Sequence, residues 1–271
     1  MPEGHTIHRL AKDHTAVLVG HSLNVSSPQG RMAESAALLD GQVLSRIDPY
    51  GKHLFYRFGS KAVNRATTVH VHLGLFGKFR QQPTPEPPKG EIRLRMVSAK
   101  ATIDLSGPTD CRIIDPEEER TIRARLGPDP IWRSADPELA WDRIRKRRSS
   151  IGEALMDQKV MAGVGNVFRA ESLFVHGIHP ERSCQGISRN DFDQLWATIT
   201  HMLRQGVVDK RIITVSKPEI VQFFGKSRSH LASKEAVYVY KRDRCLRCDT
   251  EIRRWDLSGR WAYACETCQP R

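Results

Sequence analysis

The chain has 271 residues, with 43 Lys or Arg against 31 Asp or Glu, a formal net charge of +12 and a pI near 9.7. This length suffices for one large domain or two ordinary ones, and the cationic excess favours a polyanionic partner, either nucleic acid or an anionic membrane. The sequence has no run of about 18 apolar residues and no secretory signal. We therefore expect a cytosolic, reduced protein, whose six cysteines indicate a metal site or chance rather than disulfides.

The first residues, MPEGHT, have two interpretations. In the simpler one, Pro2 is the first residue of a helix and Glu3 complements the helix dipole. A functional interpretation needs support from elsewhere in the chain. Apolar residues near helical spacing predict a helix that ends at Gly20: Ile7, Leu10, Ala11, Val17 and Leu18.

After this helix the apolar residues alternate with a period of two, which indicates strands. The turn signals PYGK (49–52) and PTPEPPKG (83–90) divide them. We therefore predict that residues 1–115 form a helix followed by an antiparallel β-sandwich. The expected strands are 52–58, 67–73, 91–97, 100–105 and 110–115.

The pattern becomes helical from about residue 116. A helix with acidic residues in its first turn stops at Gly127 and Pro128, and the next starts at Asp136 as N-cap. Its basic tail, RIRKRR (143–148), is either a solvated helix end or a phosphate-facing surface.

Two short helices, 149–160 and 166–177, flank the turn MAGVG. We expect Asn166 to cap the second of them, so that the backbone N–H groups at its start form an anion site. A longer helix, 188–206, follows with Ser188 as its cap. The weakly periodic, cationic segment 214–236 is expected to be a mobile loop.

The composition shift near residues 127–137 predicts the domain organisation of an α+β multidomain protein. The expected segments are an N-terminal domain (1–127), a linker (128–136), a helical domain (137–235) and a C-terminal finger (236–271).

The finger carries the most specific motif of the chain, two Cys-x-x-Cys pairs separated by 16 residues. Two such pairs joined by a hairpin give tetrahedral sulfur coordination, which suits one structural zinc ion. The expected ligands are Cys245, Cys248, Cys265 and Cys268.

The remaining cysteines, Cys111 and Cys184, are expected to be packing residues. His70 and His72 share one side of a strand. With no third ligand in view, we expect them to be residues of the sheet surface rather than metal ligands.

Three further groups have both an ordinary and a functional interpretation. Arg260 follows the expected hairpin tip Ser258-Gly259 and could bind a phosphate bidentately, or be a surface arginine. Lys52 follows a turn glycine, a position that any surface lysine could occupy, so it is weak evidence of a function by itself. Leu75 and Phe76 lie at an apparent turn, where they either fold back onto the core or wedge into a DNA base stack.

Together these motifs resemble the formamidopyrimidine-DNA glycosylase/endonuclease VIII family over essentially the whole chain. The match consists of MPEG, GK before a strand, HLG with an apolar pair, GVGN in a helix–two-turn–helix, and the four-cysteine finger. SGRWAY and HLGLFG resemble the endonuclease VIII branch, and the chain is most similar to a second endonuclease VIII paralogue of the actinobacterial type.

The resemblance implies a bifunctional DNA glycosylase/AP lyase that acts on oxidised pyrimidines, with damaged DNA as its partner, a monomeric state and a cytoplasmic, nucleoid-associated location. It implies that Pro2 is the nucleophile after loss of the methionine, with Glu3 as general acid/base. It assigns Lys52, Asn166 and Arg260 to phosphates. Leu75 and Phe76 would fill the void left by the flipped base, and Lys159 would lie near the lesion pocket.

The chain departs from the family at His5 and Thr6, where proline and glutamate are common. Thr6 cannot ionise, and His5 is a hypothetical replacement in proton transfer. The alternative function is a zinc-finger DNA-binding protein without catalysis, which needs no free proline amine. An RNA-binding protein is a third possibility, which predicts exposed aromatic platforms.

Overall fold

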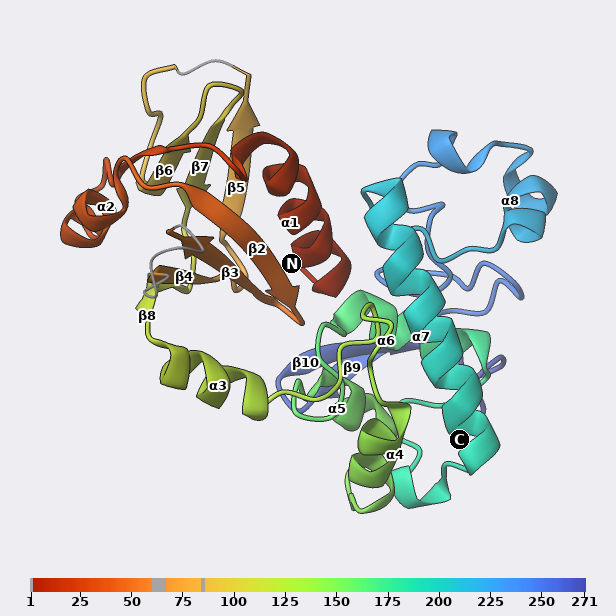
Figure 1. Ribbon diagram of the computed structural model, residues 1–271. Helices are drawn as coiled ribbons and strands as arrows, with labels where there is room; N and C mark the ends of the chain where they lie inside the picture. Colours follow the sequence, from red (N-terminus) through yellow and green to blue (C-terminus); the bar gives the residue numbers. More distant parts are fainter. Residues whose placement is uncertain (1, 60–66, 84–85) are drawn as a thin grey trace. The chain divides into compact units, whose positions relative to one another are not determined.

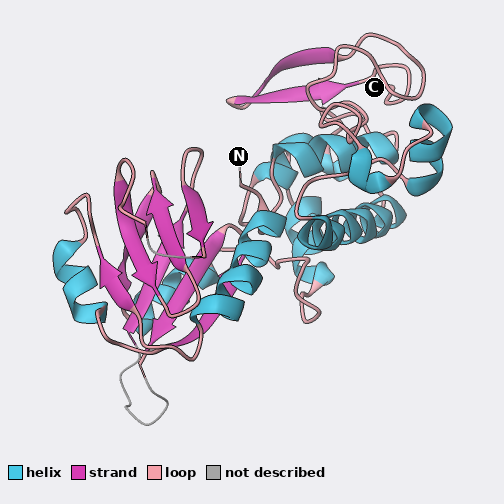
Figure 2. Ribbon diagram, turned by 90° about the horizontal axis from the view of Figure 1, so that it is seen from above, coloured by secondary structure: helices cyan, strands magenta, loops and turns pink. Residues whose placement is uncertain are grey.

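A computed structural model describes residues 2–59, 67–83 and 86–271. The chain forms two compact units, one comprising residues 1–3 and 7–125 and the other residues 4–6 and 126–271. Figure 1 traces both units, and Figure 2 shows the strands of the first unit and the helices of the second. No helix in these described ranges is long and apolar enough to cross a bilayer.

The predicted N-terminal helix is confirmed as α1, Gly4–Leu18, which is followed by Gly20 at φ +84°. The expectation that Pro2 is the first helical residue is wrong. Glu3 is the N-cap, with an extended backbone (φ −116°, ψ 176°) and no capping hydrogen bond from its side chain. Pro2 and Glu3 therefore precede the helix and do not serve as its first turn.

The predicted antiparallel sandwich is confirmed, with two four-stranded sheets in the orders β1-β6-β7-β5 and β2-β3-β4-β8. All five expected strands are present. Three further strands, β1, β2 and β5, and the short helix α2 were not predicted. The elements are β1 (Asn24–Ser26), α2 (Ala33–Leu39), β2 (Leu44–Tyr50), β3 (His53–Phe58), β4 (Thr67–His72), β5 (Lys78–Gln82), β6 (Ile92–Val97), β7 (Thr102–Ser106) and β8 (Asp110–Ile114).

The core of the sandwich lies between the sheets and α1. Leu54, Tyr56 and Phe58 alternate along β3 and are fully buried, as the period-two pattern predicts. The hydroxyl of Tyr56 is hydrogen-bonded to His14 Nδ1 of α1 at 2.8 Å. Cys111 is a buried member of this core, and burial raises the pKa of its thiol to about 12. The expectation that Cys111 packs is thus confirmed.

The helices follow their capping signals closely. Asp115, Asp136 and Ser188 each cap the expected helix through their side chains. Cys184 is buried in the core of the second unit, as expected. The helices are α3 (Pro116–Ala124) in the first unit and α4 (Pro137–Arg145), α5 (Ile151–Met156), α6 (Asn166–Val175), α7 (Arg189–Asp209) and α8 (Lys217–Phe224) in the second, with 3₁₀ turns at Cys184–Gly186 and Arg228–His230.

The expectation of a loop over 214–236 is wrong, because this segment contains α8. Ser216 caps the helix by accepting from the Glu219 amide, and Gly225 closes it at φ +60°. Ile220 is its buried residue, so apolar periodicity is weak. The start and stop signals of a short helix are nevertheless present.

The predicted finger hairpin is confirmed as β9 (Arg253–Leu257) and β10 (Arg260–Ala264). Ser258 and Gly259 form its tip at φ +52° and +76°, which is the conformation of the tight turns that match strand twist.

Candidate nucleic-acid interface and metal centre

The N-terminal segment is anchored to the turn before α6. The amide of Gly4 donates to the carbonyl oxygen of Gly163 at 2.8 Å. A Cβ on Gly4 would lie only 2.9 Å from Gly163 Cα, so the two backbones meet where a side chain does not fit. Gly163 itself adopts φ +90°, which favours glycine. The last residue of MPEG and the first residue of GVGN therefore meet in space, which their positions in the sequence do not reveal.

Pro2 is two residues from this anchor, so its Cα lies within about 7 Å of Gly4 Cα. Glu3 is buried, and its carboxylate does not cap α1. The two residues implied to be catalytic are thus held near one fixed point of the backbone.

His5 is a buried side chain that packs within the second unit. Its ring meets that of Phe168 edge to face, with centroids 5.2 Å apart. A Cβ on Gly206 would lie 3.1 Å from the ring atoms of His5. These contacts are typical of a packing residue. The proton-transfer role of His5 stays a hypothesis.

The start of α6 differs from the expectation, because Gly165 rather than Asn166 is the N-cap. Asn166 is the first helical residue, and its side-chain Nδ2 donates to the carbonyl oxygen of Trp261 at 3.0 Å. Arg169, which is 1% exposed, donates to the same oxygen at 2.8 Å. One main-chain oxygen of the finger thus joins the hairpin to the positive end of α6.

A second joint lies at the hairpin tip. Glu153 completes the capping box of α5 with Ser150 and also accepts a hydrogen bond from the Ser258 hydroxyl. Hydrogen bonds from Ser258 and Ser150 hold the pKa of Glu153 below its usual range. Arg260, beside the tip, is exposed and forms no ion pair within the described ranges. The guanidinium is therefore available to a ligand.

The four finger cysteines come together as expected, with all sulfurs within 4.8 Å of one another. Cys248 Sγ lies 3.4 Å from Cys265 Sγ and 3.5 Å from Cys268 Sγ, and Cys245 Sγ lies 3.9 Å from Cys268 Sγ. A tetrahedron with zinc–sulfur bonds of about 2.3 Å has sulfurs about 3.8 Å apart. The cluster therefore has the size of a zinc site, and its sulfurs are too far apart for disulfides.

Lys52 lies in the turn between β2 and β3. Its carbonyl oxygen is 3.0 Å from His72 Nδ1. The expectation that His70 is a sheet-surface residue is wrong, because it is only 3% exposed. Its ring lies between His53 and Asp110, at 2.8 and 3.1 Å.

Burial and the neighbouring histidines lower the pKa of His53 to about 3. The ring of His53 is therefore neutral near pH 7. The row of imidazoles beneath the Lys52 turn was not predicted, since only the pairing of β3 with β4 aligns it.

Leu75 and Phe76 occupy the tip of the turn between β4 and β5, where they are 50% and 83% exposed. They do not fold back onto the core. The flanking glycines are required by close contacts, because a Cβ on Gly74 would lie 1.8 Å from Thr109 Oγ1 and one on Gly77 would lie 2.3 Å from the Leu73 oxygen. The turn thus presents two large apolar side chains to solvent.

The basic tail of α4 is partly used for internal contacts. Arg143 donates to the carbonyl oxygens of Leu126 and Lys159, and Arg147 pairs with Asp157. The side chain of Lys159 is exposed. The tail therefore contributes to holding the turn before α6.

A buried carboxylate that the sequence analysis did not single out connects α6 to the start of the finger. Glu171 is 0% exposed and accepts hydrogen bonds from three consecutive amides and from a hydroxyl. The donors are the amides of Tyr238, Val239 and Tyr240, at 2.6, 3.0 and 2.8 Å, and the hydroxyl of Thr214, at 2.5 Å.

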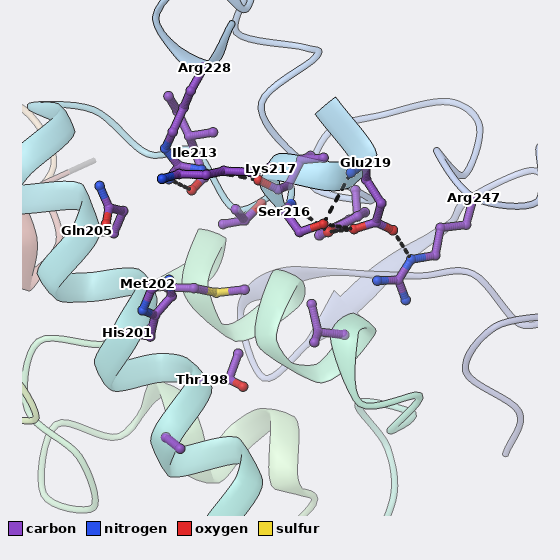
Figure 3. A pocket seen from close by; sticks show the side chains of 15 residues that line it. Thr198, His201, Met202, Gln205, Ile213, Ser216, Lys217, Glu219, Arg228 and Arg247 are labelled. Carbon is purple, nitrogen blue, oxygen red and sulfur yellow. Dashed lines mark hydrogen bonds and ion pairs between the residues drawn. The ribbon is translucent and has the colours of Figure 1, made fainter. Parts of the chain in front are cut away.

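A cavity of about 740 Å³ lies between α7 and the segment that contains α8. Figure 3 shows Glu219, which accepts hydrogen bonds from Ser216 and Arg247. It also shows Arg228, which donates a hydrogen bond to the carbonyl oxygen of Ile213. Arg228 also pairs with Asp209. The charges of Arg228 and Arg247 are thus compensated by Asp209 and Glu219. We interpret these ion pairs as contacts that stabilise the position of α8.

Comparisons with known proteins cover the same regions. Residues 1–118 match the formamidopyrimidine-DNA glycosylase N-terminal domain, and residues 126–217 match the formamidopyrimidine-DNA glycosylase H2TH domain. "Endonuclease 8 1" of Mycobacterium tuberculosis (strain ATCC 25618 / H37Rv) is 45% identical over 277 aligned positions, covering 99% of this chain and all of that protein. The formamidopyrimidine-DNA glycosylase of Thermomicrobium roseum is 26% identical, covering 100% and 99%.

Among solved structures, the Lactococcus lactis Fpg protein with THF-DNA and an inhibitor superposes with a TM-score of 0.81 at 22% identity, over the full length of both chains. This likeness concerns the fold. The mycobacterial relative carries the number 1 in its name, and so gives no support to the expectation of a second paralogue.

Proposed function

Because the chain belongs to the formamidopyrimidine-DNA glycosylase/endonuclease VIII family of base-excision-repair DNA glycosylases and AP lyases, we propose that it excises oxidised pyrimidines and then cleaves the strand by β- and δ-elimination. The observation that carries the proposal is the hydrogen bond between Gly4 and Gly163. It ties the residues that follow Pro2 and Glu3 to the turn that begins α6.

Pro2 is the nucleophile. Once the preceding methionine is removed, its amine has a pKa of about 7.7–8.0 and is partly unprotonated near neutrality. Its lone pair forms a bond to C1′ of the damaged nucleotide, and the glycosidic bond breaks with its electron pair going to the base. The base takes up the proton that the amine loses, the C1′–O4′ bond then breaks as O4′ is protonated, and the iminium ion so formed is an electron sink. Loss of a C2′ proton then expels the 3′ phosphate, and a second elimination expels the 5′ phosphate.

Glu3 moves the protons of these steps. Its carboxyl group protonates the sugar oxygen as the ring opens, and the carboxylate accepts a proton in the eliminations. Support comes from the position of Glu3, which follows Pro2 directly in the chain and has a buried side chain that does not cap α1.

The DNA backbone is held by Lys52, Asn166 and Arg260, and Lys159 lies near the lesion pocket. The exposure of Arg260 supports its part. Because the Asn166 side chain is bonded to Trp261, we assign to it the orientation of the finger, with phosphate binding through the N-terminus of α6. Leu75 and Phe76 enter the base stack when the nucleotide flips out.

Cys245, Cys248, Cys265 and Cys268 hold one zinc ion, which supplies rigidity to the hairpin and takes no part in the chemistry. Damaged DNA is the partner, and the enzyme acts as a monomer on the nucleoid in the cytoplasm. The segments 1–127, 128–136, 137–235 and 236–271 are proposed as the catalytic domain, linker, helix–two-turn–helix domain and finger.

Borohydride trapping tests this function. The protein is incubated with a duplex that carries one abasic site, reduced, and the adduct is mapped by mass spectrometry. An adduct on Pro2 is expected. A matched chain with one glycine inserted before Pro2 converts the amine to an amide, and should bind the duplex without forming the adduct.

The outcomes separate the alternatives. An adduct on a lysine would retain the enzyme but refute Pro2 as the nucleophile. Binding without any adduct, from a protein that holds zinc, would favour the non-catalytic zinc-finger DNA-binding protein.

A further inference from the structure

The first Cys-x-x-Cys turn of the finger carries an arginine whose side chain leaves the finger. Arg247 stands between Cys245 and Cys248. The turn is closed by the Cys245 amide, which donates to the Thr250 oxygen at 2.8 Å, and by the Asp249 amide, which donates to the Cys245 oxygen at 3.0 Å. The same turn supplies two of the four clustered sulfurs. The backbone at Arg247 is therefore placed by the geometry that brings these sulfurs together.

The Arg247 guanidinium contacts a carboxylate of α8 and two aromatic rings. Its Nε donates to Glu219 Oε1 at 2.7 Å, a contact drawn in Figure 3. Its Cζ lies 4.7 Å from the ring centroid of Tyr238 and 5.1 Å from that of Phe174. The two rings stack on each other with centroids 5.0 Å apart. Because a guanidinium can donate from its edge while its face packs on rings, these contacts together favour a single position of Arg247.

Glu219 makes the polar contacts at the start of α8. One carboxylate oxygen, Oε1, accepts from Arg247. The other, Oε2, accepts from the Ser216 hydroxyl at 2.5 Å and from the Tyr238 hydroxyl. The Tyr238 hydroxyl oxygen also accepts from the Ser216 amide at 2.9 Å. The first turn of α8 is thus bonded to the finger through Arg247, and to the chain that enters the finger through Tyr238.

The helix α8 depends on contacts with its neighbours, because a helix of eight residues is marginal in isolation. In the described range 86–271, Ile220 is the buried residue of α8, whereas six residues of α7 are buried. Ile220 belongs to the same apolar cluster as Cys245. The chain after α8 is held by Arg228, which pairs with Asp209 of α7 at 2.7 Å. The start of α8, which lines the cavity beside α7, therefore relies on Ile220 and on its polar contacts with the finger.

We propose that Arg247 makes the position of α8 depend on the metal of the finger. A structural zinc site is ordered only while the ion is bound, so loss of the ion would release the turn that places Arg247. The pairing of Arg247 with Glu219 would then be lost, and α8 would move away from the cavity beside α7. The metal state of the finger thus controls an element outside the finger. This inference rests on the proposed zinc site and is independent of the proposed catalytic steps.

Hydrogen–deuterium exchange of the full-length protein tests this coupling, with peptides from α7 and α8 read by mass spectrometry. Zinc-loaded wild type is compared with wild type after chelation under reducing conditions, and the zinc content of each sample is measured. Chelation should speed exchange in α8 at least about tenfold, because charged hydrogen bonds no longer oppose local opening. Exchange in α7 should change much less. In Arg247→Gln, α8 should already exchange fast with zinc bound, and chelation should add no more than about twofold.

Glu219→Gln removes the same ion pair from the other side, so the test does not depend on the folding of one variant. It should reproduce the fast exchange, and the double variant should exchange no faster than either single variant. Arg244→Gln is the matched control, because Arg244 pairs with Asp249 within the finger. This control should keep slow exchange in α8 and the full response to chelation. Arg228→Gln should speed exchange at the other end of the segment but leave α8 responsive to zinc.

Three results would overturn the proposal. The first is slow, wild-type exchange of α8 in both zinc-loaded variants, Arg247→Gln and Glu219→Gln. The second is a full response to chelation in both variants, which would assign the coupling to the apolar cluster around Ile220. The third is a wild-type α8 that does not respond to loss of the ion. Zinc content and borohydride trapping, measured on the same samples, report on the proposed metal site and the proposed nucleophile, so their failure is distinguishable from a failure of the coupling.

Discussion

The amide of Gly4 donates to the carbonyl oxygen of Gly163 at 2.8 Å, and no room for a side chain remains between them. Gly4 and the turn before α6 therefore belong to the same structural unit, although 159 positions separate Gly4 from Gly163 in the numbering.

Gly4→Ala should disturb this contact. The new Cβ would lie 2.9 Å from Gly163 Cα, so the segment carrying Pro2 must move. Since a misplacement of about 1 Å can cost about 100-fold in rate, we expect that order of loss in the borohydride trapping rate, with DNA affinity nearly unchanged. Gly186→Ala, whose Cβ would have no neighbour closer than 3.8 Å, is the control. A wild-type trapping rate in Gly4→Ala would refute this role for the contact.

Glu171→Gln should weaken the joint between α6 and the start of the finger. Both carboxylate oxygens accept two hydrogen bonds each, and the amide nitrogen of glutamine cannot accept. Leaving buried donors unsatisfied costs about 1–3 kcal/mol each, so we expect a loss of about 2–4 kcal/mol in unfolding free energy, measured by tryptophan fluorescence in urea. The exposed Glu251→Gln should change little. Equal stabilities of the two variants would contradict the prediction.

The acid sensitivity of the sandwich should depend on Glu119. Burial opposes its charge, but hydrogen bonds from Arg57 and Arg123 hold its pKa below the ordinary value of 4.5. A folded-state pKa below that of the unfolded chain means that the stabilisation is complete above about pH 4.5 and is lost as the pH falls through the folded value. Wild type should therefore lose stability below about pH 4.5, and Glu119→Gln should lose less over the same range.

Far-ultraviolet circular dichroism is the appropriate measurement for Glu119, because all five tryptophans follow residue 125. Glu117→Gln is the control, since that side chain is 84% exposed. Parallel pH profiles for wild type and Glu119→Gln would show that the carboxylate is not responsible.

Zinc removal should abolish DNA binding. A stoichiometry of one zinc per chain is expected by atomic absorption. Cys248→Ser should lower it, since a structural site needs all four thiolates. Cys184→Ala, which alters a buried packing residue, should keep the metal. A zinc-free chain with unchanged affinity for the duplex would refute the structural role of the ion.

Phe76→Ala should weaken recognition without affecting the fold. The side chain is 83% exposed, so stability should change by no more than about 0.5 kcal/mol. Affinity for a duplex with a flipped-out site should fall about tenfold relative to undamaged DNA, because a wedge is lost. Val208→Ala, at another exposed apolar residue, is the control. An equal loss on damaged and undamaged duplexes would argue against a wedge.

Helices and strands with a clear apolar periodicity or with capping residues could be predicted from the sequence. Those that depend on contacts with neighbouring elements could not. β3 and β4 lie inside a sheet and carry consecutive buried residues, with apolar and aromatic side chains that marked them as strands. The missed strands β1, β2 and β5 are all at sheet edges, where one neighbour is absent and the sequence is more polar. α8 was missed because only Ile220 is buried, although Ser216 and Gly225 mark its ends.

In the candidate site, too, the sequence predicted some of the contacts and not others. The cysteine spacing predicted the cluster of sulfurs, because four side chains of one type must meet a single ion. Asn166, Arg169 and Glu171 instead contact main-chain atoms 67 to 95 residues away. Every residue carries those atoms, so nothing in the sequence marks the partner.

The joint at Trp261 has a consequence for how this chain tolerates change over evolutionary time. Asn166 and Arg169 bind the carbonyl oxygen of that residue and not its indole. Any amino acid at position 261 supplies the same oxygen, so the joint places no constraint on the side chain there. A single insertion or deletion in the hairpin would move this oxygen out of reach of Asn166 and Arg169. Position 261 therefore tolerates substitutions, whereas the length of the hairpin is constrained.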